Sequence, residues 1–174
     1  MPSAFGHALF GAALGASFRA RGALIAAAAF CSVAPDFDVI AFRFGVPYEA
    51  ALGHRGFTHS LAFAAVLGVV VAASLRAALP RTARPPFASS AALLALATAS
   101  HGFFDALTNR GLGVTFFWPL DETRWFLPWR PIAVSPLGVS RFFSARGAEV
   151  LASEAVWVGL PGLTLWLASR VSRS

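Results

Sequence analysis

Residues 56–75 read GFTHSLAFAAVLGVVVAASL, and residues 85–104 read PPFASSAALLALATASHGFF. Neither stretch contains an aspartate, a glutamate, a lysine or an arginine. An α-helix rises about 1.5 Å per residue, so about 20 residues cross the ~30 Å hydrocarbon core of a bilayer. Both stretches are therefore predicted to be transmembrane helices.

Three further stretches, residues 2–18, 22–35 and 155–169, also lack acids and arginine. The first two of these are doubtful as spans, since the 14 residues of 22–35 would reach only about 21 Å as a helix, and together we expect them to form a short pair, a tilted hairpin or helices shielded by neighbours. The last stretch is long enough if Glu149 and Glu154 lie at its entrance, with a kink at Pro161. The predicted fold class is all-α, an integral membrane bundle of four or five helices.

The composition of the 174 residues agrees with a membrane protein. Hydrophobic residues make up 57% and charged residues 13%, with a mean hydropathy of +0.66. A soluble domain of this size could not cover its surface with so few polar groups, and the same numbers exclude disorder. We expect residues 1–174 to form one membrane-embedded domain whose partner is the lipid bilayer.

The basic residues lie between the apolar stretches. All 14 are arginine, and the net charge is +6. Because they are scattered between apolar stretches rather than gathered in a patch, we expect anchoring at membrane boundaries and no nucleic-acid partner. If each stretch reverses the chain direction, one side carries arginines without any acid, as is typical of cytoplasmic connections; these are Arg19, Arg21, Arg76, Arg81, Arg84, Arg170 and Arg173.

The same alternation gathers an unusual polar set at the opposite end of the bundle. It includes all four histidines and three of the four aspartates of the chain. Ionisable residues close to lipid are expensive and usually functional. The members are His7, Asp36, Asp38, His54, Arg55, His59, His101 and Asp105.

These residue types at this spacing indicate a metal site. His101 and Asp105 are four apart and share a helix face, and an extended Asp36-Phe37-Asp38 would point both carboxylates the same way. Imidazole suits zinc, whereas carboxylates also accept Mn²⁺ or Mg²⁺. Seven candidates exceed the ligands of one tetrahedral zinc, so two or more ions are expected. The predicted ligands are His7, Asp36, Asp38, His54, His59, His101 and Asp105.

Each part of the set also has a simpler interpretation. His7 could be a packed histidine, Asp36 and Asp38 could be turn formers after Pro35, and His101 could simply bond to Asp105. Thr58 could cap the third helix. The convergence of all of them on one end favours the metal site.

The order of these residues resembles the YdjM-type family of bacterial inner-membrane proteins, which are described as predicted membrane-bound metal-dependent hydrolases. The resemblance covers roughly residues 1–140 and implies a multi-pass protein of the cell inner membrane with a divalent-metal site. By a more distant analogy, the helical His-x-x-x-Asp is similar to ligands of zinc-dependent phospholipase C and P1-type nucleases. The matching motifs are His7, Pro35-Asp36-x-Asp38, His54-Arg55-Gly56-x-Thr58-His59-Ser60, His101-x-x-x-Asp105 and Trp118-Pro119.

The expected function is metal-dependent hydrolysis of a phosphoester, such as a lipid head group or a lipid-linked phosphate. Metal ions would lower the pKa of a bound water from 15.7 towards about 7. Arg55 would neutralise charge on the phosphoryl oxygens, and Asp36 or Asp38 could act as a base instead of a ligand.

Two other functions are open. The first is a non-enzymatic membrane protein that binds or transports a divalent cation, although transport sites usually lie near mid-membrane. The second is a purely structural metal, although structural zinc sites are closed by four ligands.

The connection of residues 109–146 is the last feature of interest. It contains three tryptophans among arginines, and its prolines favour extended or turn structure over another span. Trp beside Arg is typical of an interfacial loop. The alternative is a lid in which Arg124, Arg130 and Arg141 meet a phosphate.

Overall fold

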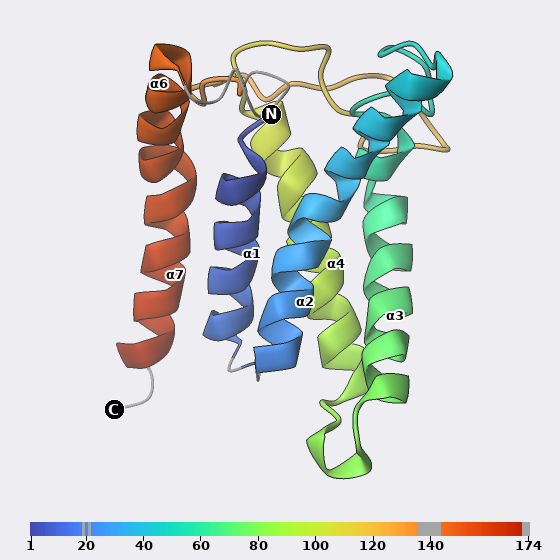
Figure 1. Cartoon of the computed structure of the whole chain (residues 1–174), viewed down its shortest axis with the longest axis vertical. Helices are drawn as coiled ribbons and strands as arrows, with labels where there is room; N and C mark the ends of the chain where they lie inside the picture. Colours follow the sequence, from blue (N-terminus) through green and yellow to red (C-terminus); the bar gives the residue numbers. More distant parts are fainter. Residues whose placement is uncertain (19, 21, 136–143, 172–174) are drawn as a thin grey trace.

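The computed structural model describes residues 1–18, 20, 22–135 and 144–171. In this part of the chain the regular elements are helices, and only two isolated β-bridges occur. The helices run side by side along one axis (Figure 1). They are α1 (Ala4–Ser17), α2 (Gly22–Val33), η1 (Ala34–Phe44), η2 (Phe57–His59), α3 (Leu61–Ala78), η3 (Arg81–Ala83), α4 (Phe87–Ala106), α6 (Ala145–Glu154), η4 (Ala155–Gly159) and α7 (Leu160–Val171).

Within the described residues, four helical segments are long and apolar enough to cross a membrane, and the shorter α1 packs against α2, α4 and α7. The prediction of an all-α membrane bundle of four or five helices is confirmed. The four segments are Gly22–Phe44, Leu61–Ala78, Phe87–Ala106 and Ala145–Val171.

The second segment differs from the expectation of a short helix. Pro35 does not end it, because η1 continues α2 as a 3₁₀ helix and lengthens the segment to 23 residues. The extended conformation under which Asp36 and Asp38 would point the same way is therefore not adopted. Since a 3₁₀ helix turns about 120° per residue, the two carboxylates leave the helix in different directions.

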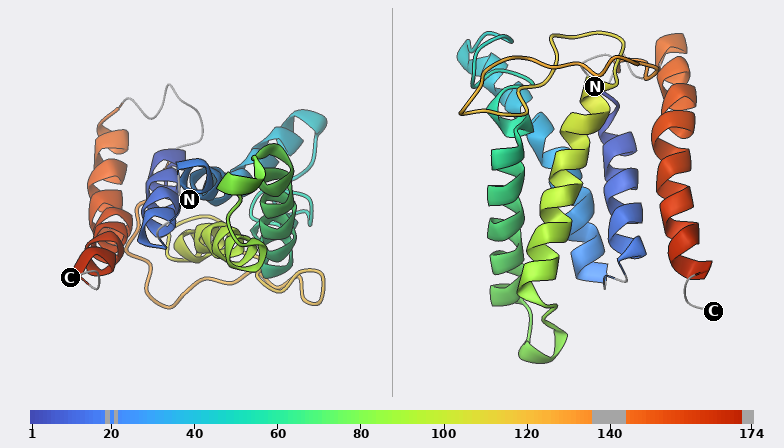
Figure 2. Two further views of the ribbon diagram at one scale, coloured as in Figure 1. Left: turned by 90° about the horizontal axis from the view of Figure 1, so that it is seen from below. Right: turned by 180° about the vertical axis from the view of Figure 1, so that it is seen from behind.

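Small residues allow the helices to approach closely, as is common in membranes. Gly11 on α1 faces Ala28 and Ser32 on α2, and Gly68 on α3 faces Ala91 and Ala95 on α4. The apolar core lies between α1, α2, α3 and α4, with Leu94 and Ala97 fully buried. Viewed along the bundle, α7 lies at its edge beside α1 (Figure 2).

Gly68→Ala is expected to destabilise the bundle by about 1–3 kcal/mol, the usual cost of overpacking a filled core. A Cβ at this position would lie 2.6 Å from the Ala91 carbonyl oxygen and 2.6 Å from the Ala95 nitrogen, both backbone atoms. Thermal unfolding in detergent measures the effect. Gly22→Ala is the control, because its added Cβ would meet nothing within 4 Å, and equal melting temperatures for the two variants would contradict the packing described here.

The ends of the bundle agree with the predicted alternation (Figure 1). The C-terminal end of α1, the N-terminal end of α2, the α3–α4 connection and the C-terminal end of α7 lie at one end, together with Arg76, Arg81, Arg84 and Arg170. Of the seven arginines predicted there, Arg19, Arg21 and Arg173 lie outside the described residues. The N-terminus, the loop after η1 and residues 107–135 lie at the opposite end, where the polar set is expected.

The C-terminal segment begins at Ala145 and passes through a π-helical turn before Pro161. Glu149 is exposed and pairs with Arg146. Glu154 is buried, and its carboxylate accepts hydrogen bonds from the hydroxyl (2.6 Å) and the backbone N–H of Ser3, the N-cap of α1. The segment is thus joined to the start of the helix that carries His7.

Candidate metal centre

The eight residues of the predicted polar set converge at one end of the bundle, and all of them are buried. They come from four segments that are far apart in sequence. His7 lies on α1, Asp36 and Asp38 on η1, His54, Arg55 and His59 on the connection up to and including η2, and His101 and Asp105 on α4.

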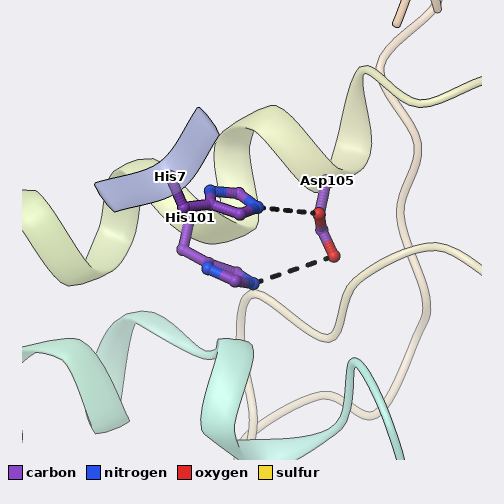
Figure 3. A group of neighbouring side chains, drawn as sticks. All are labelled: His7, His101 and Asp105. Carbon is purple, nitrogen blue, oxygen red and sulfur yellow. Dashed lines mark ion pairs between the residues drawn. The ribbon is translucent and has the colours of Figure 1, made fainter. Parts of the chain in front are cut away.

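One group of possible ligands consists of His7, His101 and Asp105 (Figure 3). His7 Nε2 lies 3.5 Å from Asp105 Oδ1, and His101 Nε2 lies 4.0 Å from Asp105 Oδ2. The two imidazole rings stack with centroids 3.7 Å apart. Both rings therefore present nitrogen to the same carboxylate, as Figure 3 shows.

A second group consists of Asp36, His54 and His59. The two groups meet at His101, whose Nε2 lies 3.1 Å from His59 Nε2 and 3.3 Å from Asp36 Oδ1. His59 Nε2 also lies 3.5 Å from Asp105 Oδ2. The two groups thus form one continuous cluster of nitrogen and carboxylate oxygen atoms.

Asp38 lies behind the histidines of the second group. Its carboxylate bonds to His54 Nδ1 at 2.6 Å and lies 3.3 Å from His59 Nδ1. It also accepts hydrogen bonds from the Thr58 hydroxyl at 2.8 Å and from the backbone N–H of Arg55 at 3.2 Å. A carboxylate that holds Nδ1 leaves Nε2 of the same ring free for a metal.

Ser32 orients His101, the histidine of α4, in the same way that Asp38 orients His54. The Ser32 carbonyl lies 2.7 Å from His101 Nδ1, and the Ser32 hydroxyl donates to the His7 carbonyl at 2.7 Å. Sequence reasoning missed this residue, because a serine in an apolar helix carries no signal of its hydrogen-bond partners. Thr58 is likewise not a helix cap, since the cap of α3 is Ser60, whose Oγ accepts from the Phe63 N–H.

Arg55 is the cation of the cluster. Its Nε lies 2.9 Å from Asp105 Oδ2, and its terminal nitrogens donate to Thr108 Oγ1 at 3.0 Å and to the Arg110 carbonyl at 3.3 Å. The side chain is only 1% exposed, and its backbone adopts a φ of 62°. Arg55 thereby joins the His-Arg-Gly block to the end of α4.

Several buried polar atoms of the cluster make no hydrogen bond with the protein. Among the described residues, seven buried side-chain atoms of His7, Asp36, Arg55 and Asp105 make no hydrogen bond of good geometry, and their close neighbours are other charged or imidazole groups of the cluster, as for Arg55 Nε and Asp105 Oδ2. Buried polar atoms in native proteins nearly always have a hydrogen-bond partner, and a bound ion is one accepted explanation for atoms that have none. The donor set therefore fits a divalent metal.

The net charge of the cluster also favours a bound cation. With neutral histidines, three carboxylates face one guanidinium, so the cluster carries a net charge of about −2, which is costly to bury. Burial lowers the pKa of His59, but the hydrogen bonds and charges of Asp105 and Asp38 outweigh burial and raise it to about 9. Without a metal, a protonated His59 offsets part of the excess charge, and a divalent cation would offset all of it.

Asp38→Asn is expected to weaken metal binding about 10–100-fold, the usual effect of losing a group that orients a ligand. An amide cannot accept from both Nδ1 atoms, so His54 and His59 would lose their fixed orientation. Competition with a fluorescent zinc chelator measures the affinity, and Glu49→Gln, an exposed carboxylate at the same end, is the control. An affinity equal to that of the wild type would contradict the role described for Asp38.

Residues 107–135 close the end of the bundle over the cluster. Arg124 donates to the backbone carbonyls of Tyr48, Ala50 and His54 at 3.2–3.3 Å. Arg130 lies over the ring of Phe126, whereas Arg141 lies outside the described residues. Extended or turn structure rather than a further span is found for residues 109–135. The two described arginines of the supposed lid contact the protein itself.

The known proteins to which this chain is similar are inner membrane proteins. The sequence model of the YdjM inner membrane protein family matches residues 1–173, further than the roughly 140 residues expected from the motifs. Inner membrane protein YbcI of Escherichia coli (strain K12) is 36% identical over 168 residues, which cover 95% of each chain. No solved structure matches the chain.

Proposed function

The chain belongs to the YdjM inner membrane protein family, and on this premise we propose that it is a membrane-bound metal-dependent hydrolase of phosphoesters. It is a multi-pass protein of the inner membrane. The proposed substrate is a lipid head group or a lipid-linked phosphate. We propose further that residues 1–174 act as one domain, with residues 109–146 as its interfacial loop.

One observation carries the proposal. Nitrogen and carboxylate atoms from four separate segments meet in a buried cluster in which seven polar atoms make no hydrogen bond of good geometry. A closed structural zinc site needs four ligands, whereas this cluster offers more, which supports an open site with two or more ions. Zinc, with Mn²⁺ or Mg²⁺ as alternatives, suits the mixture of imidazole and carboxylate.

The roles of the residues follow from their positions. We assign His7, His59, His101 and Asp105 to metal binding because their free atoms face one another. His54 completes the proposed ligand set, whereas Asp38, which the sequence predicted as a ligand, bonds to His54 Nδ1, lies 3.3 Å from His59 Nδ1 and is proposed to orient both rings. A divalent ion held there would supply an activated water at neutral pH.

Asp36 and Arg55 have the proposed catalytic roles. The carboxylate of Asp36 makes no hydrogen bond of good geometry and faces His101 Nε2 at 3.3 Å and His59 Nε2 at 4.0 Å, a position from which it could bind the same metal or accept a proton from water. Arg55 carries a permanent positive charge and five N–H donors. Three acceptors engage it in the structure, so N–H groups remain to stabilise charge on a phosphoryl group.

A phosphatase assay tests the proposal. The purified protein, loaded with Zn²⁺ or Mn²⁺, is expected to release phosphate from phosphatidic acid or p-nitrophenyl phosphate in mixed micelles. His59→Ala is expected to abolish this release, whereas Asp121→Asn, on a loop outside the cluster, is expected to leave it unchanged.

Failure of the metal-loaded wild type on both substrates would contradict the hydrolase. Retention of metal in that case would indicate the non-enzymatic metal-binding alternative. Cation uptake into proteoliposomes would then separate a transporter from a protein that only binds the ion.

A further inference from the structure

A long apolar groove runs along the membrane-facing flank of the bundle, where α1, α4 and α7 meet. Its volume is about 980 Å³, close to the upper end of the range for ligand pockets. None of the predicted metal ligands lines it. Its walls include Phe10, Leu96, Phe103, Phe104, Trp157 and Leu165.

The lining excludes a polar occupant. Ser100 and Thr164 are the lining residues that carry hydroxyl groups, and each donates to a carbonyl of its own helix, Ala97 and Pro161 respectively. Aromatic and aliphatic side chains form nearly all of the remaining surface. The groove therefore fits hydrocarbon.

The length of the groove matches one leaflet of a bilayer. On α4 the lining extends from Leu96 to Leu107, a helical rise of about 17 Å. Half of a ~30 Å hydrocarbon core is about 15 Å. Since these helices are long and apolar enough to cross the membrane, the solvent at the groove is lipid, and the groove has the length of an extended acyl chain of one leaflet.

One end of the groove lies directly beside the metal cluster, because Phe104 contacts both. Phe104, a lining residue, precedes Asp105, and its ring lies 6.5 Å from that of His7. Phe10 packs edge-on against Phe104 at 4.7 Å. Trp129 and Trp157 pack edge-on at 4.5 Å beside the closing loop, in the manner of interfacial aromatic residues. A lipid whose chain lies in the groove therefore has its head group at the end that holds the cluster.

We propose that this groove binds one acyl chain of a membrane lipid from the leaflet on the side of the cluster, and that it thereby selects lipid phosphoesters. The binding of the chain stands on the groove alone, and only the selection of a substrate rests on the proposed hydrolase function. Packing contacts hold the chain, since burial from lipid into an apolar groove gives no hydrophobic gain.

Two variants fill the groove from different helices. Ala99→Trp fills it from α4, and Thr164→Trp fills it from α7, which contributes no predicted ligand. Leu163→Trp is the matched control, because Leu163 is an exposed neighbour of Thr164 that does not line the groove. Native mass spectrometry measures retained dioleoyl phosphatidic acid, and elemental analysis measures metal.

Both groove variants are expected to lose retained dioleoyl phosphatidic acid about tenfold or more, at wild-type metal content. The control is expected to retain it. Hydrolysis of dioleoyl phosphatidic acid is expected to fall in parallel, whereas hydrolysis of p-nitrophenyl phosphate, which has no acyl chain, stays at the wild-type rate.

The outcomes separate the two proposals. Loss of lipid in both groove variants, with no hydrolysis by the wild type, would support the groove and contradict the hydrolase. Wild-type lipid retention in Thr164→Trp would overturn the groove proposal, even if Ala99→Trp fails to fold. Lipid retention by groove variants that are monomeric, beside a wild type that is dimeric in the same detergent, would also overturn it, because a second copy of the chain would then be the occupant.

Discussion

Asp105→Asn is expected to reduce the metal content of the purified protein to background and to abolish phosphoester hydrolysis. Asp105 is the residue on which both ligand groups and the cation converge, with His7, His59 and Arg55 within 3.5 Å of its oxygens. The amide keeps the volume of the side chain but loses the charge that attracts the ion. Elemental analysis and phosphate release measure the two effects.

The choice of substitution separates loss of the site from loss of the fold. Asp105→Ala leaves the buried guanidinium of Arg55 without its carboxylate, which typically destabilises a protein by about 3–5 kcal/mol. Asp105→Asn retains a polar partner and is expected to unfold at a higher temperature than Asp105→Ala. A folded Asp105→Asn protein with wild-type metal content would contradict the assignment of Asp105 as a ligand.

Arg55→Lys is expected to lower the rate of hydrolysis about 10²–10³-fold, the usual cost of losing one donor to the transition state, while metal stays bound. Lysine keeps the charge but not the planar fork, so it cannot reach Asp105, Thr108 and the Arg110 carbonyl together as Arg55 does. Steady-state kinetics on p-nitrophenyl phosphate measure kcat, and elemental analysis confirms that the site is loaded.

Arg110→Lys is the matched control for this variant. Arg110 lies in the same region and is exposed, and Arg55 contacts only its backbone carbonyl. Its substitution is expected to leave kcat unchanged. A wild-type kcat in Arg55→Lys would remove Arg55 from the proposed mechanism and leave it the structural role of joining the His-Arg-Gly block to α4.

The architecture could be predicted because lipid imposes it. Long stretches without charge must form helices in a bilayer, and helices that reverse direction bring His7, Asp36, His59 and Asp105 to one end. The prediction was weaker at Pro35, which usually ends an α-helix. A 3₁₀ helix continues the segment there instead, so Asp36 and Asp38 do not point the same way as they would in an extended segment.

The contacts behind the cluster could not be predicted in the same way. Ser32 holds His101 through its backbone carbonyl, an atom that every residue has, so no residue type marks the role. Arg124 binds three carbonyls of the loop after η1, whereas the sequence indicated an interfacial anchor or a lid. Such contacts depend on which loops lie side by side, and periodicity carries no information about that.

The metal content of the wild-type protein is the most direct test of the central claim, that the buried cluster is a metal centre. The protein is purified in detergent without chelator, reconstituted with Zn²⁺ or Mn²⁺, freed of unbound ions and measured by elemental analysis. We predict two or more ions per chain, as the surplus of ligands requires. A content of only a small fraction of one ion per chain after reconstitution with either metal would contradict the account, and the histidines and aspartates would then form a hydrogen-bonded polar network alone.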